Sequence, residues 1–228
     1  MIKTCIKNKK DLFIDKNNLN YDKKNINFKT PWLKYDDFLS QKYLSVINTA
    51  SNYALCNRAI LGENILLELK KIFPKLEYSL INDTSHNNIK LEDENMLVVR
   101  KGASRILEPY NIDLPWEYRH IGQPVMVGGS MGTYSYILVG NDCKKTYRST
   151  CHGSGRLVPR SKCHEIFTYE DTLSKMRDIH LQCNNKKGVI EEGPDCYKDV
   201  NEVVKSSEKN GITNTVCRVK PLYVIKDV

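Results

Sequence analysis

Hydrophobic positions recur at helical spacing in the first half of the chain. Apolar residues follow one another every three or four positions over 41–54, and a second series of the same kind covers 65–73. Pro74 lacks the backbone N–H that a helix needs, so the second series is expected to stop there. Gly62, a poor helix former, lies between the two series. The pattern therefore predicts a helical hairpin that breaks near Gly62.

Beyond Pro74 the hydrophobic runs are short and typical of strands. Three of them, 96–99, 124–127 and 134–139, are bounded by Gly, Asn, Asp or Pro. The C-terminal VCRVKPLYVIK also indicates extended backbone, and its Pro221 indicates a strand edge or a bulge. A sheet is therefore expected at the centre of the fold.

Two later segments, 169–180 and 199–209, have the pattern of helices. In the second, Asp199 is the expected N-cap, Glu202 follows three residues later, and Gly211 lies just past the end. Antiparallel-looking strands mixed with separate helices predict an α+β fold, with a central mixed or antiparallel sheet flanked by helices, rather than a doubly wound sheet.

The first part of the chain differs from the rest in composition. Residues 1–30 are rich in Asn and Lys and carry only isolated apolar residues, so we expect a poorly ordered insertion or extension there. Across 228 residues, 40% are hydrophobic and 27% are charged, which is typical of a globular protein. Residues 31–228 are therefore expected to form, or to belong to, a single domain.

Charge and cysteine usage narrow the class of protein. The formal net charge of +8 favours a polyanionic partner such as RNA or DNA, although many basic proteins bind no nucleic acid. The eight cysteines are scattered without a Cys-x-x-Cys pair, which disfavours a zinc module and indicates reduced thiols. The opening segment lacks the apolar stretch of a signal peptide, and no run approaches a membrane span. A cytoplasmic or nuclear location is therefore expected.

Three glycine- or asparagine-rich segments are candidates for chemistry. They are SHNN at 85–88, GGSMGTYSY at 128–136 and STCHGSGR at 149–156. Glycine lets the backbone approach a ligand closely, and the free N–H groups of such turns suit phosphates and nucleobase edges. Taken singly, each segment is a weak signal, and Gly128, Gly129 and Gly132 could equally mark a strand-ending turn.

His152 is the most informative residue of these segments. Small residues flank it in STCHGSGR, which predicts an accessible imidazole with Arg156 close by in sequence. An imidazole can act as a base, a metal ligand or a nucleophile, and attack on a nucleoside triphosphate would give a high-energy phosphoramidate. A structural histidine, hydrogen-bonded within the fold, is the alternative.

The order of the segments from about residue 30 onward resembles the RtcB family of RNA ligases. The helical stretch from Pro31, SHNN, VVRKGASR, GQPVMVGGSMGTYSYILVG, STCHGSGR, EEGPDCYKDVNEVV and the terminal KPLYVIK follow one another in family order. The chain is identified as the C-terminal half of such a ligase. An RtcB-like fold is what this resemblance implies.

The resemblance also implies a set of site residues. The family's guanylated nucleophile falls on His152, and His86 falls on a manganese ligand. Lys226 matches the lysine that recognises guanine. The other positions expected beside the nucleotide are Asn87, Gly128, Gly129, Ser130, Met131, Ser135, Gly153, Ser154 and Gly155. Simpler interpretations remain open: Ser135 as a polar strand residue, Met131 as a core residue and Lys226 as a solvated charge.

The activity implied by the family is a GTP- and Mn²⁺-dependent joining of RNA ends. A His152–GMP adduct would pass GMP to an RNA 3′-phosphate, derived from a 3′-phosphate or 2′,3′-cyclic phosphate end. A 5′-hydroxyl end would then displace GMP. The resemblance implies tRNA exon halves as substrates, with archease and a DEAD-box helicase as partners. Candidate residues for holding RNA phosphates are Arg100, Lys101, Arg156 and Arg160.

Most of the family's metal donors have no match in this sequence. The Asp-x-x-Cys-Gly segment, the Gly-Asn-His segment and a further histidine are all missing, which leaves His86 as the matching ligand. One imidazole cannot hold a divalent ion by itself. We therefore expect a fragment, a truncated gene model or one part of a split enzyme. A catalytically inactive RNA-binding or scaffold module that keeps the fold is the alternative.

Overall fold

The structure is a computed structural model that describes residues 35–92 and 96–225. The chain divides into two compact units, one ending at Glu68 and one beginning at Leu69. Residues 1–30, expected to be an extension, and the expected site residue Lys226 lie outside the described residues. No helix within the described residues is long and apolar enough to cross a membrane.

The first unit consists, in its described part, of most of one long helix. Helix α2 runs from Phe38 to Ile72 without interruption, and none of its residues is buried. It ends two residues before Pro74, as expected, but the predicted break at Gly62 is wrong. A single glycine costs a helix only about 1 kcal/mol relative to alanine, which the strong helix formers on both sides offset. No side chain or backbone crowds Gly62, so nothing forces a kink there.

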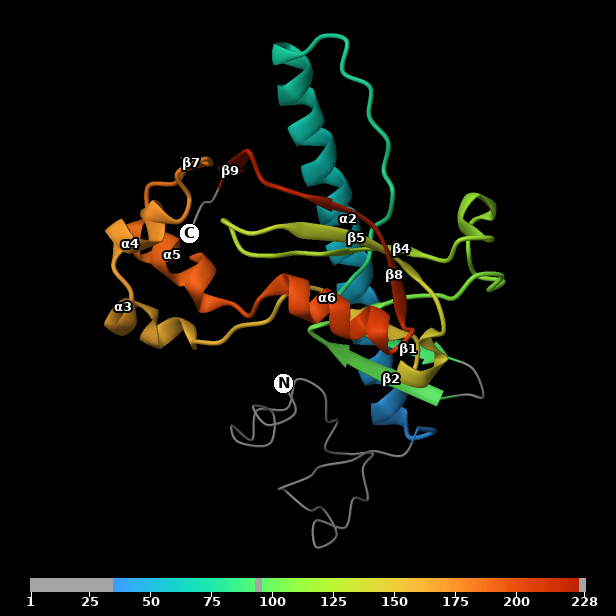
Figure 1. The fold of residues 1–228 in the computed structure, drawn as a ribbon. Helices are drawn as coiled ribbons and strands as arrows, with labels where there is room; N and C mark the ends of the chain where they lie inside the picture. The colour runs from blue at the N-terminus through green and yellow to red at the C-terminus, as the bar shows by residue number, and fades with distance from the viewer. Residues whose placement is uncertain (1–34, 93–95, 226–228) are drawn as a thin grey trace, which may run out of the picture. The chain divides into compact units, whose positions relative to one another are not determined.

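The second unit holds all the strands that the structure describes (Figure 1). They are β1 (Asn87–Glu92), β2 (Met96–Lys101), β3 (Ala103–Arg105), β4 (Pro124–Val127), β5 (Ser135–Gly140), β6 (Ser149–Cys151), β7 (His180–Gln182), β8 (Thr213–Val219) and β9 (Tyr223–Ile225). β1 pairs with β2, β3 with β6, and β4, β5 and β8 form a three-stranded sheet, all antiparallel, while β7 and β9 pair in parallel. Several small sheets therefore take the place of one large one.

The main hydrophobic core lies where helix α6 (Val200–Lys209) covers the three-stranded sheet. Its fully or nearly fully buried residues are Ile106, Val125, Val127, Tyr136, Leu138, Cys143, Val200 and Val204. The alternation along β4 explains this core, because Val125 and Val127 face inward while Met126 between them is exposed. Asp199 is the N-cap of α6, as expected, and its side chain accepts a hydrogen bond from the Asn201 N–H. The chain turns at Gly211, just past the end of the helix, also as expected.

Short helices gather at the other end of the second unit, around β7 and β9 (Figure 1). They are α3 (Cys163–Ile166), α4 (Tyr169–Ser174) and α5 (Lys186–Glu191), and the 3₁₀ turns of this unit are η2 (Trp116–Tyr118), η3 (Cys143–Thr146), η4 (Arg160–Lys162) and η5 (Pro194–Cys196). Met131 packs here with Met176, Ile179 and Val189. The Met131 side chain thus anchors the turn between β4 and β5 in this part of the fold.

The α+β class is confirmed, and so are the predicted strands at 96–99, 124–127 and 134–139. The C-terminal segment forms β8 and β9 on either side of Pro221, as its composition indicated. The helix predicted over 169–180 is wrong in its second half, since α4 ends at Ser174 and His180 begins β7. The His180 N–H bonds the Leu222 carbonyl, a long-range pairing that the local pattern could not reveal.

Candidate functional site

His152 follows directly after strand β6 and has an exposed side chain. β6 pairs with β3 so that Cys151 lies opposite Ala103. Pairing with β3 therefore fixes the position of the backbone from which the His152 imidazole projects.

The corner before β3 brings His86 to the same place. The His86 carbonyl accepts hydrogen bonds from the N–H groups of Gly102 (2.8 Å) and Ala103 (3.3 Å). Gly102 has φ +74°, a left-handed conformation that glycine adopts without steric cost. The side-chain carbonyl of Asn87 accepts a further bond from the Gly102 N–H at 3.1 Å. Asn87, expected beside the nucleotide, thus also holds this corner.

The two imidazoles are stacked, with ring centroids 4.4 Å apart and an angle of 16° between the planes. Burial lowers the pKa of His152 below its ordinary value, and the neighbouring His86 lowers that pKa further. At neutral pH the His152 ring is therefore mainly unprotonated. It has a nitrogen lone pair available for a metal, a proton or an electrophile.

The glycine-rich segment 128–135 lies beside the loop that follows His152. The Gly128 N–H donates to the His152 carbonyl at 3.3 Å, and the Ser154 N–H donates to the Gly128 carbonyl at 3.0 Å. Gly128 and Gly153 thus form a parallel bridge. Two segments far apart in sequence, both predicted to contact a nucleotide, are side by side in the structure.

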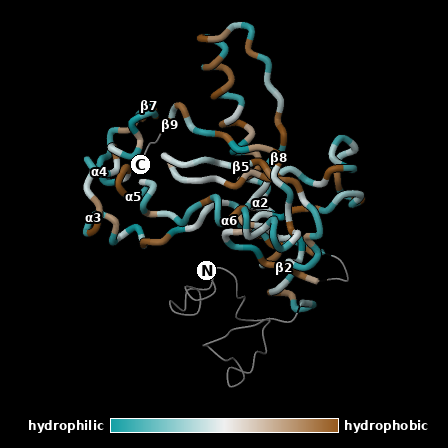
Figure 2. The backbone as a smooth tube through the Cα atoms, in the orientation of Figure 1, coloured by the Kyte–Doolittle hydropathy of each residue, from teal (hydrophilic) through white to brown (hydrophobic). Residues whose placement is uncertain are grey.

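Internal hydrogen bonds fix the shape of the 128–135 turn. The Gly129 N–H donates to the Ser135 hydroxyl at 3.2 Å, and the Ser130 N–H donates to the Thr133 hydroxyl at 2.8 Å. Figure 2 shows this connection between β4 and β5 in pale shades, since its residues are neither strongly hydrophobic nor strongly hydrophilic. Met131 is buried, which agrees with its interpretation as a core residue, so a nucleotide contact by Met131 would have to come from its backbone.

Two features of these loops are those of a ligand-binding surface: open space at one glycine and a buried hydroxyl without a partner among the described residues. A Cβ added to Gly128 would meet no atom within 4 Å, whereas one added to Gly129 would lie 2.0 Å from the Tyr134 carbonyl oxygen. Packing within the described residues explains why position 129 must be glycine, but it gives no such reason for position 128. The Ser154 hydroxyl oxygen is buried and has no hydrogen-bond partner among the described residues. Both observations fit a ligand that approaches the loops.

Of the four expected phosphate-binding cations, Arg100 and Arg156 have other roles. Arg100 is only 4% exposed, and its guanidinium bonds internal acceptors, so the prediction for Arg100 is wrong. Each guanidinium nitrogen of Arg156 also has an internal acceptor, and the group lies over the Tyr197 ring at 4.8 Å. Arg156 therefore holds the loop after His152 in place. Lys101 is exposed, and the exposed Arg160 pairs with Glu192 at 3.0 Å.

Lys198 is a basic residue at the site that the sequence pattern did not single out. Its N–H donates to the Gly155 carbonyl at 2.9 Å, and its side chain runs past Gly155, with Cδ 4.0 Å from the position of an added Cβ. The Lys198 side chain is exposed. The signal in the sequence is its place in EEGPDCYKDVNEVV, one of the segments that follow in family order.

The described residues do not include a complete metal centre. No group of three or more His, Cys, Asp or Glu side chains converges anywhere in 35–92 and 96–225. A divalent transition-metal site needs several such donors, so His86 and the unprotonated His152 are at most part of one.

A separate hollow of about 300 Å³ lies on the α6 side of β6. It is lined by Ala103, Thr146, Ser149, Thr150, Cys151, Val203, Ser206, Ser207, Asn210 and Ile212. His152 is not among these residues. The candidate site is therefore distinct from this hollow.

Comparison with known proteins shows which family the chain resembles. The family model described as "tRNA-splicing ligase RtcB" matches residues 11–227. An "RNA-splicing ligase RtcB homolog 1" of Entamoeba dispar is 37% identical over 203 residues, which cover 82% of this chain and 38% of the relative. The "tRNA-splicing ligase RtcB" of Nanoarchaeum equitans is 35% identical over 207 residues, which cover 84% of this chain and 43% of the relative.

The chain thus spans about two fifths of the length of these relatives. The matched part holds both histidines, the 128–135 turn and the loop after His152, which the structure brings together. By the family match over nearly its whole length, the chain belongs to the tRNA-splicing ligase RtcB family.

Proposed function

We propose that this chain carries the guanylate-accepting part of an RNA ligase, with His152 as the nucleophile. One observation carries the proposal: an exposed imidazole stacked on a second imidazole, with two glycine-rich loops side by side at its backbone. The lowered pKa of His152 adds support, because an unprotonated ring nitrogen is the form that attacks phosphorus.

The proposed reaction has three steps: guanylation of His152, transfer of the guanylyl group to an RNA 3′-phosphate, and joining of the two RNA ends. An unprotonated nitrogen of His152 attacks the α-phosphorus of GTP, an N–P bond forms, pyrophosphate leaves, and the ring loses its other proton or keeps a positive charge until transfer. An RNA 3′-phosphate oxygen then attacks the same phosphorus, which releases His152. Finally, the 5′-hydroxyl of a second RNA attacks the 3′-phosphate, loses its proton, and displaces GMP.

The loops have properties that suit a guanylate. The open space at Gly128 accommodates a ligand close to the backbone, and the buried Ser154 hydroxyl lacks a partner in the described part of the chain. The proposal includes backbone or side-chain contacts from Gly128, Gly129, Ser130, Met131, Ser135, Gly153 and Gly155, and base recognition by Lys226. The internal bonds of the 128–135 turn would keep these groups in a fixed geometry before the nucleotide arrives.

Manganese fits the described residues poorly. His86 supplies one imidazole, and no group of three donors surrounds it within the part of the chain that the structure describes. We therefore assign no step of the reaction to a metal on this chain. Mn²⁺ enters the proposal only for a protein in which further donors join His86.

RNA is the proposed polyanionic substrate. The formal net charge of +8 favours phosphate binding, and Lys101 and Lys198 have exposed side chains next to Gly102 and Gly155 respectively. Relatives named as RNA-splicing and tRNA-splicing ligases support tRNA exon halves as substrates. Archease and a DEAD-box helicase remain proposed partners from the family resemblance, and a cytoplasmic or nuclear location remains a proposal from the scattered cysteines.

A second candidate is a catalytically inactive RNA-binding module that keeps the fold. The absence of a convergent metal-donor group in 35–92 and 96–225 favours it. The two functions differ in covalent chemistry, not in RNA affinity.

The experiment that separates them uses two RNA fragments, one ending in a 3′-phosphate and one beginning with a 5′-hydroxyl. The chain, together with the segments that carry the family's other metal donors, is incubated with both fragments, GTP and MnCl₂, and the joined product is followed on a denaturing gel. The ligase proposal predicts a product that requires GTP and is lost in His152→Ala. RNA binding without GTP-dependent joining would support the inactive module instead.

A further inference from the structure

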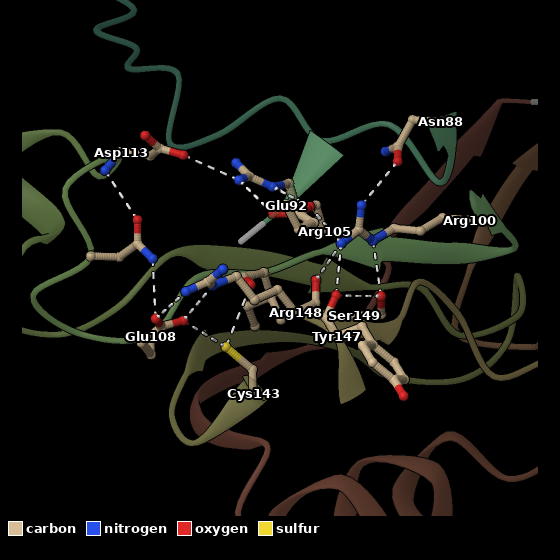
Figure 3. Close-up of polar contacts among 12 residues, drawn as sticks. Asn88, Glu92, Arg100, Arg105, Glu108, Asp113, Cys143, Tyr147, Arg148 and Ser149 are labelled. Carbon is tan, nitrogen blue, oxygen red and sulfur yellow. Dashed lines mark hydrogen bonds and ion pairs between the residues drawn. The ribbon is translucent and has the colours of Figure 1, made fainter. Parts of the chain in front are cut away.

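Arg100 occupies a central position between the segments that carry the two stacked histidines. It lies on β2, its side chain is almost completely buried, and its donors are shared among five acceptors (Figure 3). Burying an unpaired guanidinium is very costly, so these bonds are needed for the residue to be there at all.

The acceptors of Arg100 belong to two different parts of the chain. At the start of β6 they are the Ser149 hydroxyl (2.9 Å) and the carbonyls of Tyr147 (2.9 Å) and Arg148 (3.1 Å). In the β1–β2 hairpin they are the Glu92 carboxylate (2.8 Å) and the Asn88 side-chain carbonyl (3.3 Å). One side chain therefore ties the hairpin to β6.

Each end of this connection continues to a histidine. The Asn88 amide donates to the Ser85 carbonyl at 2.9 Å, and Ser85 directly precedes His86. On the other side, Ser149 begins the three-residue strand β6, which His152 directly follows. The links from Arg100 to both imidazoles are thus short and made of hydrogen-bonded or covalently adjacent groups.

We propose that Arg100 is a positioning residue that keeps His86 stacked on His152. This role rests on the proposed function in one respect only, namely that the orientation of His152 matters for attack on GTP. Arg100 contacts neither a nucleotide nor RNA in this role. It acts through Asn88 and Ser149.

Arginine is required because of the geometry of its donors. The planar guanidinium spreads its N–H groups over three nitrogens in a fixed fork, so it can donate to acceptors on two sides at once. A lysine at this position keeps the charge but has three donors on one atom, so it cannot serve both segments at once. Arg100→Lys is therefore the most direct disruption.

Arg105→Lys is a matched control. Arg105 donates to the same carboxylate, Glu92, and also to Asp113, and these bonds do not reach Asn88 or Ser149. It lies on β3, the strand that follows β2 in the sequence. A loss caused by weakening Glu92 contacts in general would appear in both variants.

The test uses the full chain labelled with ¹³C in its histidine rings. Cross-peaks between the ring protons of His86 and His152 report that the two rings are close. They can be assigned because the chain has only five histidines. We expect these cross-peaks in the unaltered protein and in Arg105→Lys, and at least a fivefold loss of intensity in Arg100→Lys. Asn88→Ala, which cuts the connection while leaving the arginine in place, should also weaken them. Unchanged cross-peaks in Arg100→Lys, or an equal loss in Arg105→Lys, would overturn the inference.

Two further measurements test the role of Arg100: the ring contacts in Asn88→Ala and the rate of guanylation. If Arg100→Lys does not fold, Asn88→Ala decides: retained cross-peaks there contradict the proposal. In a complete, active ligase, Arg100→Lys should slow single-turnover guanylation by about 100-fold with little change in KM for GTP, as expected for a misplaced reacting group. Absence of guanylation in the unaltered protein would refute the proposed function, while the ring contacts would still test the role of Arg100.

Discussion

His86 and His152 lie with their imidazole rings stacked at a centroid separation of 4.4 Å. The contact joins the segment before β1 to the segment after β6, and it depends on backbone bonds from the Gly102 corner to the His86 carbonyl. The site is thus a long-range product of the fold, formed by strand pairing rather than by neighbouring residues.

Removing the His86 ring should change the surroundings of His152 without unfolding the protein, since both side chains are exposed. In His86→Ala we expect the His152 ring-proton resonances to move downfield, because they lose the shielding of a stacked aromatic ring. Histidine-selective NMR measures this, with His164→Ala as a control that should leave His152 unchanged. Identical His152 resonances in His86→Ala would contradict the stacked geometry.

Gly128 and Gly129 should respond to alanine in opposite ways. The methyl group of Gly128→Ala meets open space, so the melting temperature should hardly change, but GTP-dependent guanylation should weaken if a nucleotide fills that space. The methyl group of Gly129→Ala meets the Tyr134 carbonyl and should lower the free energy of unfolding by about 1–3 kcal/mol. Chemical denaturation and guanylation assays on both variants distinguish the two effects. Full guanylation by Gly128→Ala would argue against a nucleotide at this position.

Ser154→Ala tests whether the buried hydroxyl is kept for a ligand. An unsatisfied buried hydroxyl destabilises a protein, so its removal should raise the free energy of unfolding of the ligand-free protein by about 1 kcal/mol. Stabilisation by added GTP should decrease in the same variant. A ligand-free Ser154→Ala that is less stable than the unaltered protein would mean that the hydroxyl already has a partner in the fold.

Acid should weaken the fold through Glu108. Burial alone would raise the pKa of Glu108, but hydrogen bonds from Arg148, a backbone N–H and Asn111 outweigh it and bring the pKa from its ordinary 4.5 down to about 2. A depressed carboxyl pKa stabilises the folded state above pH 4.5, and this contribution, on the order of 2–3 kcal/mol, is lost as the pH falls toward 2. Urea unfolding between pH 6 and pH 2 measures it. Glu108→Gln should have a lower stability at pH 6 and a shallower pH dependence, and equal slopes would exclude Glu108 as a source.

Lys198 should contribute to RNA affinity through its charge. Lys198→Ala is expected to weaken single-stranded RNA binding and to reduce the salt dependence of the logarithm of the binding constant by about 0.7, the contribution of one phosphate contact. Fluorescence anisotropy at several salt concentrations measures both. Lys205→Ala is the control, because Lys205 lies on α6 and faces Glu202 at 3.7 Å. An unchanged salt slope in Lys198→Ala, or the same change in Lys205→Ala, would count against this assignment.

The local sequence pattern predicts the helices and strands themselves better than it predicts which of them pair or pack together. The strands β2, β4 and β5 and the capped helix α6 follow from hydrophobic alternation and from Asp199, because these signals lie within the element itself. The helix break predicted at Gly62 is wrong because one glycine does not outweigh the other residues of a 35-residue helix. The end of α4 was missed because His180 pairs with Leu222, far along the chain.

The candidate site was predictable as a set of residues but not as a geometry. Family resemblance pointed to His86, His152 and the Gly128 turn, and the structure brings these segments together. The sequence did not indicate that Arg100 is buried, since an arginine in VVRKGASR is as compatible with RNA binding as with an internal role. Burial and hydrogen-bond partners depend on the tertiary fold, which a single sequence does not reveal.

The most direct measurement is the intact mass of the full protein after incubation with GTP and MnCl₂, followed by peptide mapping. If His152 is the nucleophile, the mass should rise by one guanylyl group, the group should map to the peptide that contains His152, and His152→Ala should acquire none while His120→Ala acquires it normally. A guanylyl group that persists in His152→Ala, or that is absent from the unaltered protein when every metal donor of the family is present, would contradict the account.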